Sequence, residues 1–173
     1  MIPTVTAPPA PRGTRLVTIT ASTQSIGDPA TLLDLTVRGT GVVAKLPAGT
    51  YRTVSVQTGA ILELGQAGAT TPSVYKLQGL TIAAGTTLRV VGPVRVVLPG
   101  APTLSGTVGN VLQPSWLRIE QAAGSLTLSG SVVIYGEIFA PAGTVTVGNN
   151  CRVLGRIYAN GFSLSSLGVV EQP

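Results

Sequence analysis

Residues 135–140, YGEIFA, and residues 154–159, LGRIYA, carry matching side chains at a spacing of nineteen. Residues 122–130, AAGSLTLSG, align with residues 141–149, PAGTVTVGN, at the same spacing. A fixed period near twenty residues marks stacked structural units, because one unit alone cannot bury its apolar face and does so by lying on its neighbour. The region from 115 to 159 therefore predicts a solenoid.

Short apolar strands separated by glycine corners extend the pattern toward the N-terminus. Residues 42–65 and 75–92 each contain a strand, a corner and a second strand, and residues 94–106 form a third unit. Two segments between units, residues 65–72 and 107–114, are predicted to be loop insertions. No long segment with the helical period of about 3.6 residues interrupts the units. This combination favours strands that each pair with their equivalent one turn later.

We therefore predict an all-β chain folded as a single-stranded, right-handed parallel β-helix with rungs of about 19 residues. The alternative is an antiparallel sandwich, which also has short strands at regular spacing. A sandwich does not require successive strands to share residue types at matching positions, whereas stacking does. We assign residues 14–173 to the β-helix domain and residues 1–13 to an extended arm.

The arm is rich in proline. Four prolines between residues 2 and 13 remove backbone donors and favour an extended conformation. The alternation Thr4-Val5-Thr6 is compatible with a segment that lies on another subunit and offers Val5 to a groove there. The alternative is a linker of no fixed structure.

The amino-acid composition limits the kinds of partner that the protein can bind. Charged residues make up only 10% of the chain, and the net charge of +5 comes from eleven basic residues that are scattered singly. Without a basic cluster or regularly placed aromatic residues, we expect no nucleic-acid binding. No apolar run is long enough to span a bilayer, so we expect no membrane insertion. The first residues lack the pattern of a signal peptide.

The residue types also argue against catalysis. The chain has no histidine and a single cysteine, Cys151. This excludes the Ser-His-Asp and Cys-His arrangements and the usual zinc and copper sites. The six acidic residues form no close pair in the sequence, whereas glycoside hydrolysis needs two carboxyl groups around one groove. We expect a protein that is not an enzyme and that carries no cofactor or metal.

The run from Tyr135 to Val147, followed by residues 154–159, resembles a group of bacterial exported β-helix domains of poorly known function. Residues 49–51 and 92–94 fit the same group. More distantly, the chain is similar to the bactofilins, cytoskeletal proteins whose β-helical subunits join end to end. The resemblance implies the fold and an extracellular or cell-surface location, with a cytoplasmic one as the alternative. The longer period and the insertions differ from bactofilins, which argues against a cytoskeletal role.

Stacking turns the alignment into predicted contacts. Arg118, Glu137 and Arg156 fall nineteen residues apart at outward positions, and Arg95 extends the column if the second insertion loops out. Such a column of exposed charges contributes about 0–1 kcal/mol per pair, so we expect it to set the register.

An aromatic pair is predicted in the column next to these charges. Phe139 and Tyr158 are expected to point outward. They would then be covered by a loop, contact a subunit or stack on a sugar, and the first two readings are favoured.

The functional prediction rests on the two ends of the coil. A coil of rungs has an unpaired strand edge at each terminus, and such edges must be capped, charged or paired. Residues 162–170 form an apolar stretch with no charge before Glu171. We expect a structural solenoid that assembles end to end with itself, as a homo-oligomer, filament or surface layer. The alternative is an extracellular adhesion or glycan-binding module that uses the insertions. The predicted subunit-contact residues are Val5, Phe139, Tyr158, Leu164, Val169 and Val170.

Overall fold

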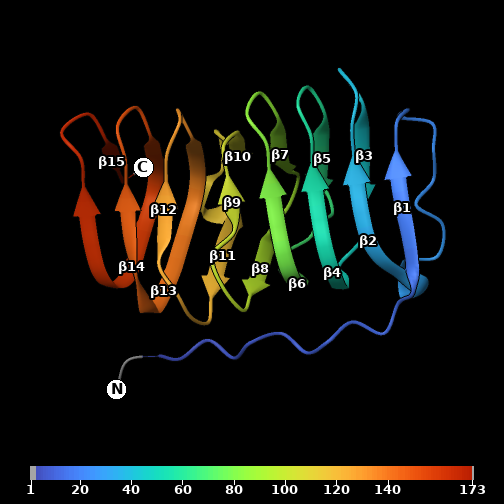
Figure 1. Cartoon of the computed structure of the whole chain (residues 1–173), viewed down its shortest axis with the longest axis horizontal. Helices are drawn as coiled ribbons and strands as arrows, with labels where there is room; N and C mark the ends of the chain where they lie inside the picture. The colour runs from blue at the N-terminus through green and yellow to red at the C-terminus, as the bar shows by residue number, and fades with distance from the viewer. Residues whose placement is uncertain (1–2, 173) are drawn as a thin grey trace.

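The computed structural model describes residues 3–172, so the first two residues of the predicted arm and the last residue of the predicted domain lie outside it. The chain folds as a parallel β-helix of about eight turns with roughly 19 residues per turn, as the sequence predicts. In Figure 1 the front strands run upward and their connections pass over the top to the strands behind, while successive turns move from right to left. The coil is therefore right-handed.

Three columns of strands build the coil. The first column contains β3 (Val43–Leu46), β5 (Ile61–Leu64), β7 (Thr87–Val90), β10 (Thr107–Gly109), the starts of β13 (Val133–Val147) and β14 (Arg152–Leu164), and β15 (Val169–Glu171). The second contains the starts of β4 (Gly49–Val56) and β6 (Ser73–Ile82), then β8 (Val94–Leu98), β11 (Leu117–Gln121) and the middles of β13 and β14. The third contains β1 (Arg15–Ile19), β2 (Leu32–Val37), the ends of β4 and β6, β9 (Thr103–Leu104), β12 (Leu126–Leu128) and the ends of β13 and β14.

The core is the stack of inward side chains from all three columns. Because side chains alternate across a strand, alternate residues of β13 point inward on each side of its register shift, and Ile134 before the shift and Val145 and Val147 after it are fully buried. Two tyrosines also lie inside, where their hydroxyls need partners. Tyr51 donates to the Pro47 carbonyl oxygen at 2.9 Å, and Tyr75 donates to the Leu46 carbonyl oxygen at 2.9 Å.

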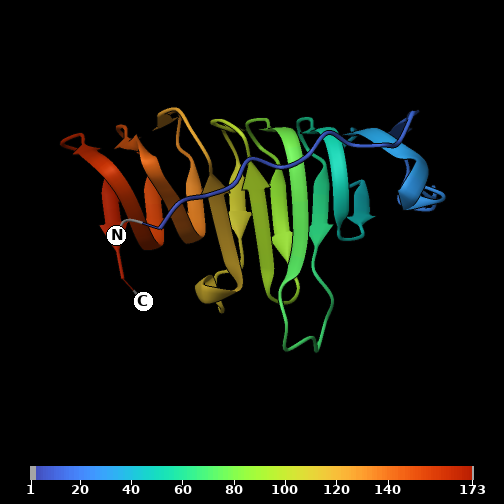
Figure 2. The same ribbon diagram turned by 90° about the horizontal axis from the view of Figure 1, so that it is seen from below.

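The first insertion lies where the sequence predicts it. Residues 65–72 connect β5 to β6 as a loop that stands away from the coil in Figure 2. The predicted start of the second insertion is wrong, because Thr107–Gly109 is strand β10, paired with β7 on one side and β13 on the other. Two neighbours satisfy its backbone groups, and Val108 is buried in the core. The loop begins after Gly109 and ends in a 3-10 helix, η2 (Pro114–Trp116).

The arm lies along its own β-helix. Figure 2 shows it crossing the outside of the turns, from the C-terminal half of the coil back to β1. The Gln78 side-chain amide donates to the carbonyl oxygens of Pro8 and Pro9 at 3.0 and 2.9 Å. Pro8 is buried, and Val5 is half-buried. Contact of Val5 with a second subunit stays a prediction.

Candidate functional site

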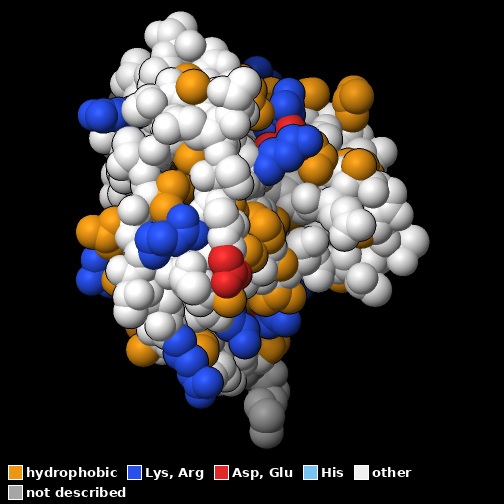
Figure 3. Space-filling model, turned by 90° about the vertical axis from the view of Figure 1, so that its right-hand side faces the viewer, with side chains coloured by type: hydrophobic (Ala, Val, Ile, Leu, Met, Phe, Trp, Pro, Cys, Tyr) orange, Lys and Arg blue, Asp and Glu red, His pale blue; other side chains and the backbone are white. Residues whose placement is uncertain are grey.

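Residues 20–31 cap the core side chains at the N-terminal end of the coil, although β1 and β3 there each pair with a strand on one side only within residues 3–172. Residues 20–31, which include the 3-10 helix η1 (Pro29–Thr31), fold against β1 and β3. The Arg15 guanidinium donates to the Ile26 carbonyl oxygen at 2.5 Å, and the Val43 amide donates to the Ser22 hydroxyl at 2.9 Å. Ile26 packs against the core. Figure 3 looks at this end and shows mostly backbone and uncharged polar side chains, with small apolar patches and both basic and acidic groups among them.

Within residues 3–172, the second and third columns have no strand beyond β14 at the C-terminal end of the coil. One inward column runs Leu126, Val145, Phe162, and Phe162 of the last turn is 52% exposed although the other two are buried. The next inward column ends in the same way, because Leu164 is 48% exposed above the fully buried Val147. These side chains occupy core positions that no following turn covers within residues 3–172.

Two further stacks of inward side chains also end in a residue that is only partly buried. Ile157 stacks on the buried Ile138, and Val170 stacks on the buried Val153, yet both end residues are only partly buried. Within residues 3–172, the stretch 156–164 of β14 pairs on one side only. Unpaired backbone groups and core-type side chains therefore meet at one end.

Four predicted contact residues lie at this open end. Tyr158 and Leu164 belong to β14, and Val169 and Val170 belong to β15. Phe139 lies one turn further in. Phe162 is the largest exposed side chain at a core position of the last turn, and it is absent from the predicted set.

Phe139 takes the outward position that the sequence predicts, but no loop insertion covers it there and it is nevertheless buried. Its strand position faces outward, but the side chain is only 8% exposed. The Arg118 guanidinium lies 4.4 Å from the ring centroid, a cation–π contact, and the Tyr158 ring centroid lies 5.9 Å away. Tyr158 is 44% exposed, as its outward position predicts. Phe139 is thus covered by its neighbours.

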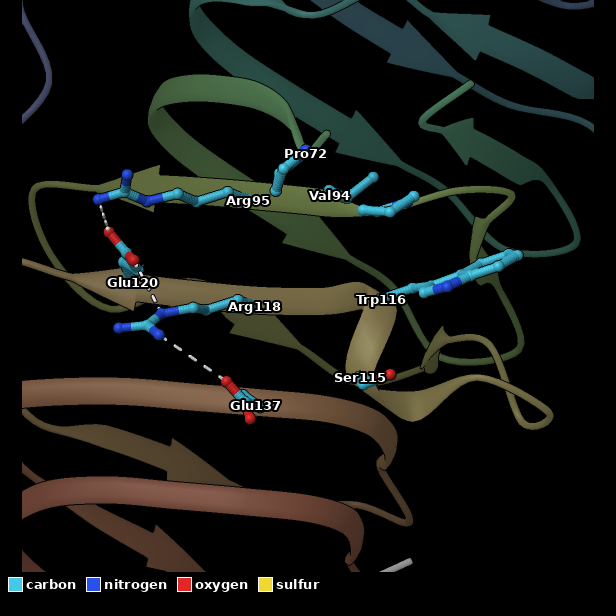
Figure 4. Close-up of a pocket in the computed structure, with 9 residues that line it drawn as sticks. Pro72, Val94, Arg95, Ser115, Trp116, Arg118, Glu120 and Glu137 are labelled. Carbon is cyan, nitrogen blue, oxygen red and sulfur yellow. Dashed lines mark hydrogen bonds and ion pairs between the residues drawn. The ribbon is translucent and has the colours of Figure 1, made fainter. Parts of the chain in front are cut away.

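A second candidate is a groove on the second column, between the two insertions (Figure 4). Its volume is about 380 Å³. The groove is lined by Pro72, Pro93, Val94, Arg95, Ser115, Trp116, Arg118, Glu120 and Glu137. Arg95 and Glu120 approach to 2.6 Å, Arg118 and Glu120 to 2.9 Å, and Arg118 and Glu137 to 3.9 Å.

The register of the predicted charge column is confirmed, since Arg95, Arg118, Glu137 and Arg156 occupy matching positions in successive turns. The predicted pair of Arg118 and Glu137 is present, but the closer ion pairs are made by Glu120, which the predicted column does not include. Arg95 and Arg118 are like charges on adjacent strands, and a neighbouring acid must offset their repulsion. Glu120, two residues beyond Arg118 on the same outward side, contacts both guanidinium groups and is only 4% exposed.

The described residues, 3–172, contain no group of His, Cys, Asp and Glu side chains that could hold a metal ion. Over the same range, no helix has the length and apolar character needed to cross a membrane. The fold and the two candidate sites define a parallel β-helix with one capped end, one open end and a lateral charged groove. No protein-family model matches the chain, and no curated protein or solved structure matches it.

Proposed function

We propose that this chain is a structural β-helix that assembles with copies of itself through its open C-terminal end. The observation that carries the proposal is the half-exposed pair Phe162 and Leu164 at core positions of the last turn. Covering the exposed half of such a side chain contributes about 0.8–1.5 kcal/mol, and each hydrogen bond made by the free edge adds about 0.5–1.5 kcal/mol. A second copy supplies both.

The difference between the two ends favours a joint between two C-terminal ends. A head-to-tail contact would require residues 20–31 to move away from β1 and β3, because they cap the N-terminal end. Two C-terminal ends related by a two-fold axis need no such change, and their free β14 edges run antiparallel, a pairing that strands accept readily. A filament or surface layer then needs a second contact elsewhere on the subunit.

Sedimentation velocity over a range of concentrations tests the proposal. We expect the intact chain to sediment as a dimer or larger species, and the double variant Phe162→Ser, Leu164→Ser to sediment as a monomer. The matched control is Val111→Ser, Leu112→Ser, which changes two apolar residues that are 61% and 82% exposed on the second insertion. The control should assemble like the parent. Assembly of the end variant at parental strength, or a folded parent that stays monomeric at every concentration, would refute the proposal. Negative-stain microscopy distinguishes closed dimers from filaments.

A second candidate function is glycan binding or adhesion at the groove. The indole of Trp116 lines the groove together with Arg95 and Arg118, whose side chains are 50% and 40% exposed. Figure 4 shows the indole at one end of the groove and the guanidinium groups of Arg95 and Arg118 pointing toward the other end. This arrangement suits an acidic oligosaccharide long enough to stack on the aromatic face at one end and to bind guanidinium through carboxylate at the other. Trp116 is the only tryptophan, so its fluorescence reports binding directly. A fluorescence change with acidic but not neutral oligosaccharides, lost in Arg95→Ala, would support this function.

Both candidate functions are compatible with an extracellular or cell-surface location, which we include in the proposal. Antibody labelling of intact cells that express the full protein tests it. Labelling only after the cells are permeabilised would place the protein inside.

A further inference from the structure

A line of outward side chains on the second column has unusual burial. The strand register aligns five positions, and we call this set the strip: Lys76, Val97, Glu120, Phe139 and Tyr158. The three central residues are only 6%, 3% and 8% exposed, although they point away from the core. Arg118 covers part of Phe139 and forms an ion pair with Glu120, so the remaining cover, over Val97 above all, must come from outside the coil.

The proline-rich arm lies next to both ends of the strip. Residues 4 and 6–9 line one cavity together with Lys76 and Val97, and Pro3 lines another together with Phe139 and Tyr158. Figure 2 shows the arm following the long axis of the coil across successive turns. At about 3.1 Å per residue the ten residues 3–12 reach about 30 Å, and the four steps of the strip span about 19 Å. The arm is therefore long enough to cover the whole strip.

The arm is held in the way that a bound peptide is held. Residues 3–12 form no strand pairing with the coil. Their side-chain anchor is Gln78, which donates to the carbonyl oxygens of Pro8 and Pro9. An extended proline-rich segment that lies on apolar and aromatic side chains, with a side-chain donor on its carbonyl groups, matches a common mode of peptide recognition.

The arm joins the β-helix at Gly13. At Gly13 an added Cβ atom would lie 2.3 Å from the Leu32 carbonyl oxygen, and the next amide, of Thr14, donates to the Thr31 carbonyl oxygen at 3.0 Å. The chain enters the body through this tight crossing. The arm before it can leave the strip without breaking any strand ladder.

We propose that the strip is an exchangeable site for the proline-rich arm, and that the arm of a second copy can take the place of the chain's own arm. The tether gives the chain's own arm an effective concentration on the millimolar scale. Exchange is therefore favoured where copies are concentrated or already held together. The inference does not depend on which end of the coil forms the joint of the proposed assembly.

Disulfide trapping between full-length chains tests the exchange. One variant carries Thr6→Cys on the arm, and a second carries Lys76→Cys on the strip; both positions are exposed and line the same cavity. The native Cys151 is fully buried and serves as a constant background. Mixing the two variants under mild oxidation, at high protein concentration, should yield a mixed disulfide dimer. The matched control replaces Lys76→Cys with Thr127→Cys, an exposed position on the third column.

We expect about tenfold more mixed dimer from the strip pair than from the control pair, which reflects specific docking of the arm. In a single chain, the double variant Thr6→Cys, Lys76→Cys should form an internal disulfide. Gln78→Ala should lower both products, and Gln57→Ala, an exposed glutamine elsewhere on the coil, should lower neither. An internal disulfide without excess mixed dimer would show that the arm does not exchange. Failure of both disulfides would show that the arm does not occupy the strip.

Discussion

Phe162 lies directly over Val145 in the same inward column, yet Phe162 is 52% exposed and Val145 is fully buried. Val145 has a turn on each side, whereas Phe162 has one on a single side. An apolar side chain at an inward position thus stabilises the fold in the middle of the coil, whereas at the end of the coil it forms part of an apolar surface. This distinction separates mutations that should unfold the protein from those that should change its association.

Leu128 and Leu164 make this distinction measurable. They belong to one inward column, with exposures of 0% and 48%. Leu128→Ala removes fully packed atoms and should lower the free energy of unfolding by about 2–5 kcal/mol. Leu164→Ala should cost less than about 1.5 kcal/mol in the monomer, because about half of the side chain is already in water.

Denaturant unfolding at low protein concentration measures both effects. Sedimentation then separates the roles, since Leu164→Ala should weaken association and Leu128→Ala should not while it remains folded. Equal losses of stability in the two variants would mean that the last turn is covered even in the monomer.

The buried tyrosines predict a loss of stability at high pH. Burial raises the pKa of Tyr51 to about 12, and burial likewise raises the pKa of Tyr75 above its ordinary value. The folded state therefore favours the neutral hydroxyl, so this stabilisation is complete below the unfolded pKa of about 10. It is lost as the pH rises from about 10 toward about 12. For Tyr51 the loss amounts to about 2–3 kcal/mol.

Unfolding measured at pH about 9 and about 11 tests the sign of this effect. Tyr51→Phe should lower stability at pH 9, because the bond to the Pro47 carbonyl oxygen is lost. The variant should also reduce the difference between the two pH values. A pH dependence as steep as that of the parent would assign the alkaline loss to other groups.

The spacing of nineteen in residues 115–159 was sufficient to predict the parallel β-helix. In the structure, Arg118 and Glu137 pair as neighbours, as do Gly136 and Gly155. Because each turn stacks on the next, residues that align at this spacing are also neighbours in the structure. The open end could also be predicted, because residues 162–170 are apolar and the acid Glu171 comes only after them.

The same alignment fails where the register changes. The pairing of β13 with β14 shifts between Ala140 and Thr144, so that Val145 lies against Phe162 at a spacing of seventeen. A constant spacing of nineteen would place Val145 against Leu164 and would leave Phe162 unrecognised. The role of Glu120 was missed for a different reason. Its partners, Arg118 on the same strand and Arg95 on the adjacent strand, do not occupy positions equivalent to Glu120. A comparison of equivalent positions in successive turns therefore does not consider these contacts.

Stacked glycines predict a sharp steric effect. Gly155 lies on Gly136, and a Cβ atom at Gly155 would lie 1.9 Å from the Gly136 carbonyl oxygen. Gly155→Ala must push two turns apart and should destabilise by about 1–3 kcal/mol or more. Gly100→Ala is the control, because a Cβ atom there would meet no atom within 4 Å. Its effect should stay within about 0.5 kcal/mol. Thermal unfolding compares the two, and similar melting temperatures would contradict the close stacking of these turns.

Glu120 should be the most sensitive acid on the surface of the coil. Its carboxylate lies 2.6 Å from Arg95 and 2.9 Å from Arg118, and it is 4% exposed. Glu120→Gln keeps the shape but leaves two guanidinium groups on adjacent strands without their shared counter-charge. We expect a loss of about 1–3 kcal/mol in the free energy of unfolding. The control is Glu171→Gln, whose pair with Arg152 spans 3.5 Å and is about half exposed on both sides, so its effect should stay below about 1 kcal/mol.

Salt dependence distinguishes charge from packing in the Glu120→Gln variant. The repulsion between Arg95 and Arg118 acts through partly exposed guanidinium groups, so salt screens it. The Debye length falls from about 10 Å at 0.1 M salt to about 3 Å at 1 M. The stability difference between parent and variant should therefore shrink over that range, as measured by thermal unfolding in NaCl. A difference that stays constant would mean that Glu120 acts through the shape and hydrogen bonds of its carboxylate, and that the two arginines do not need its charge.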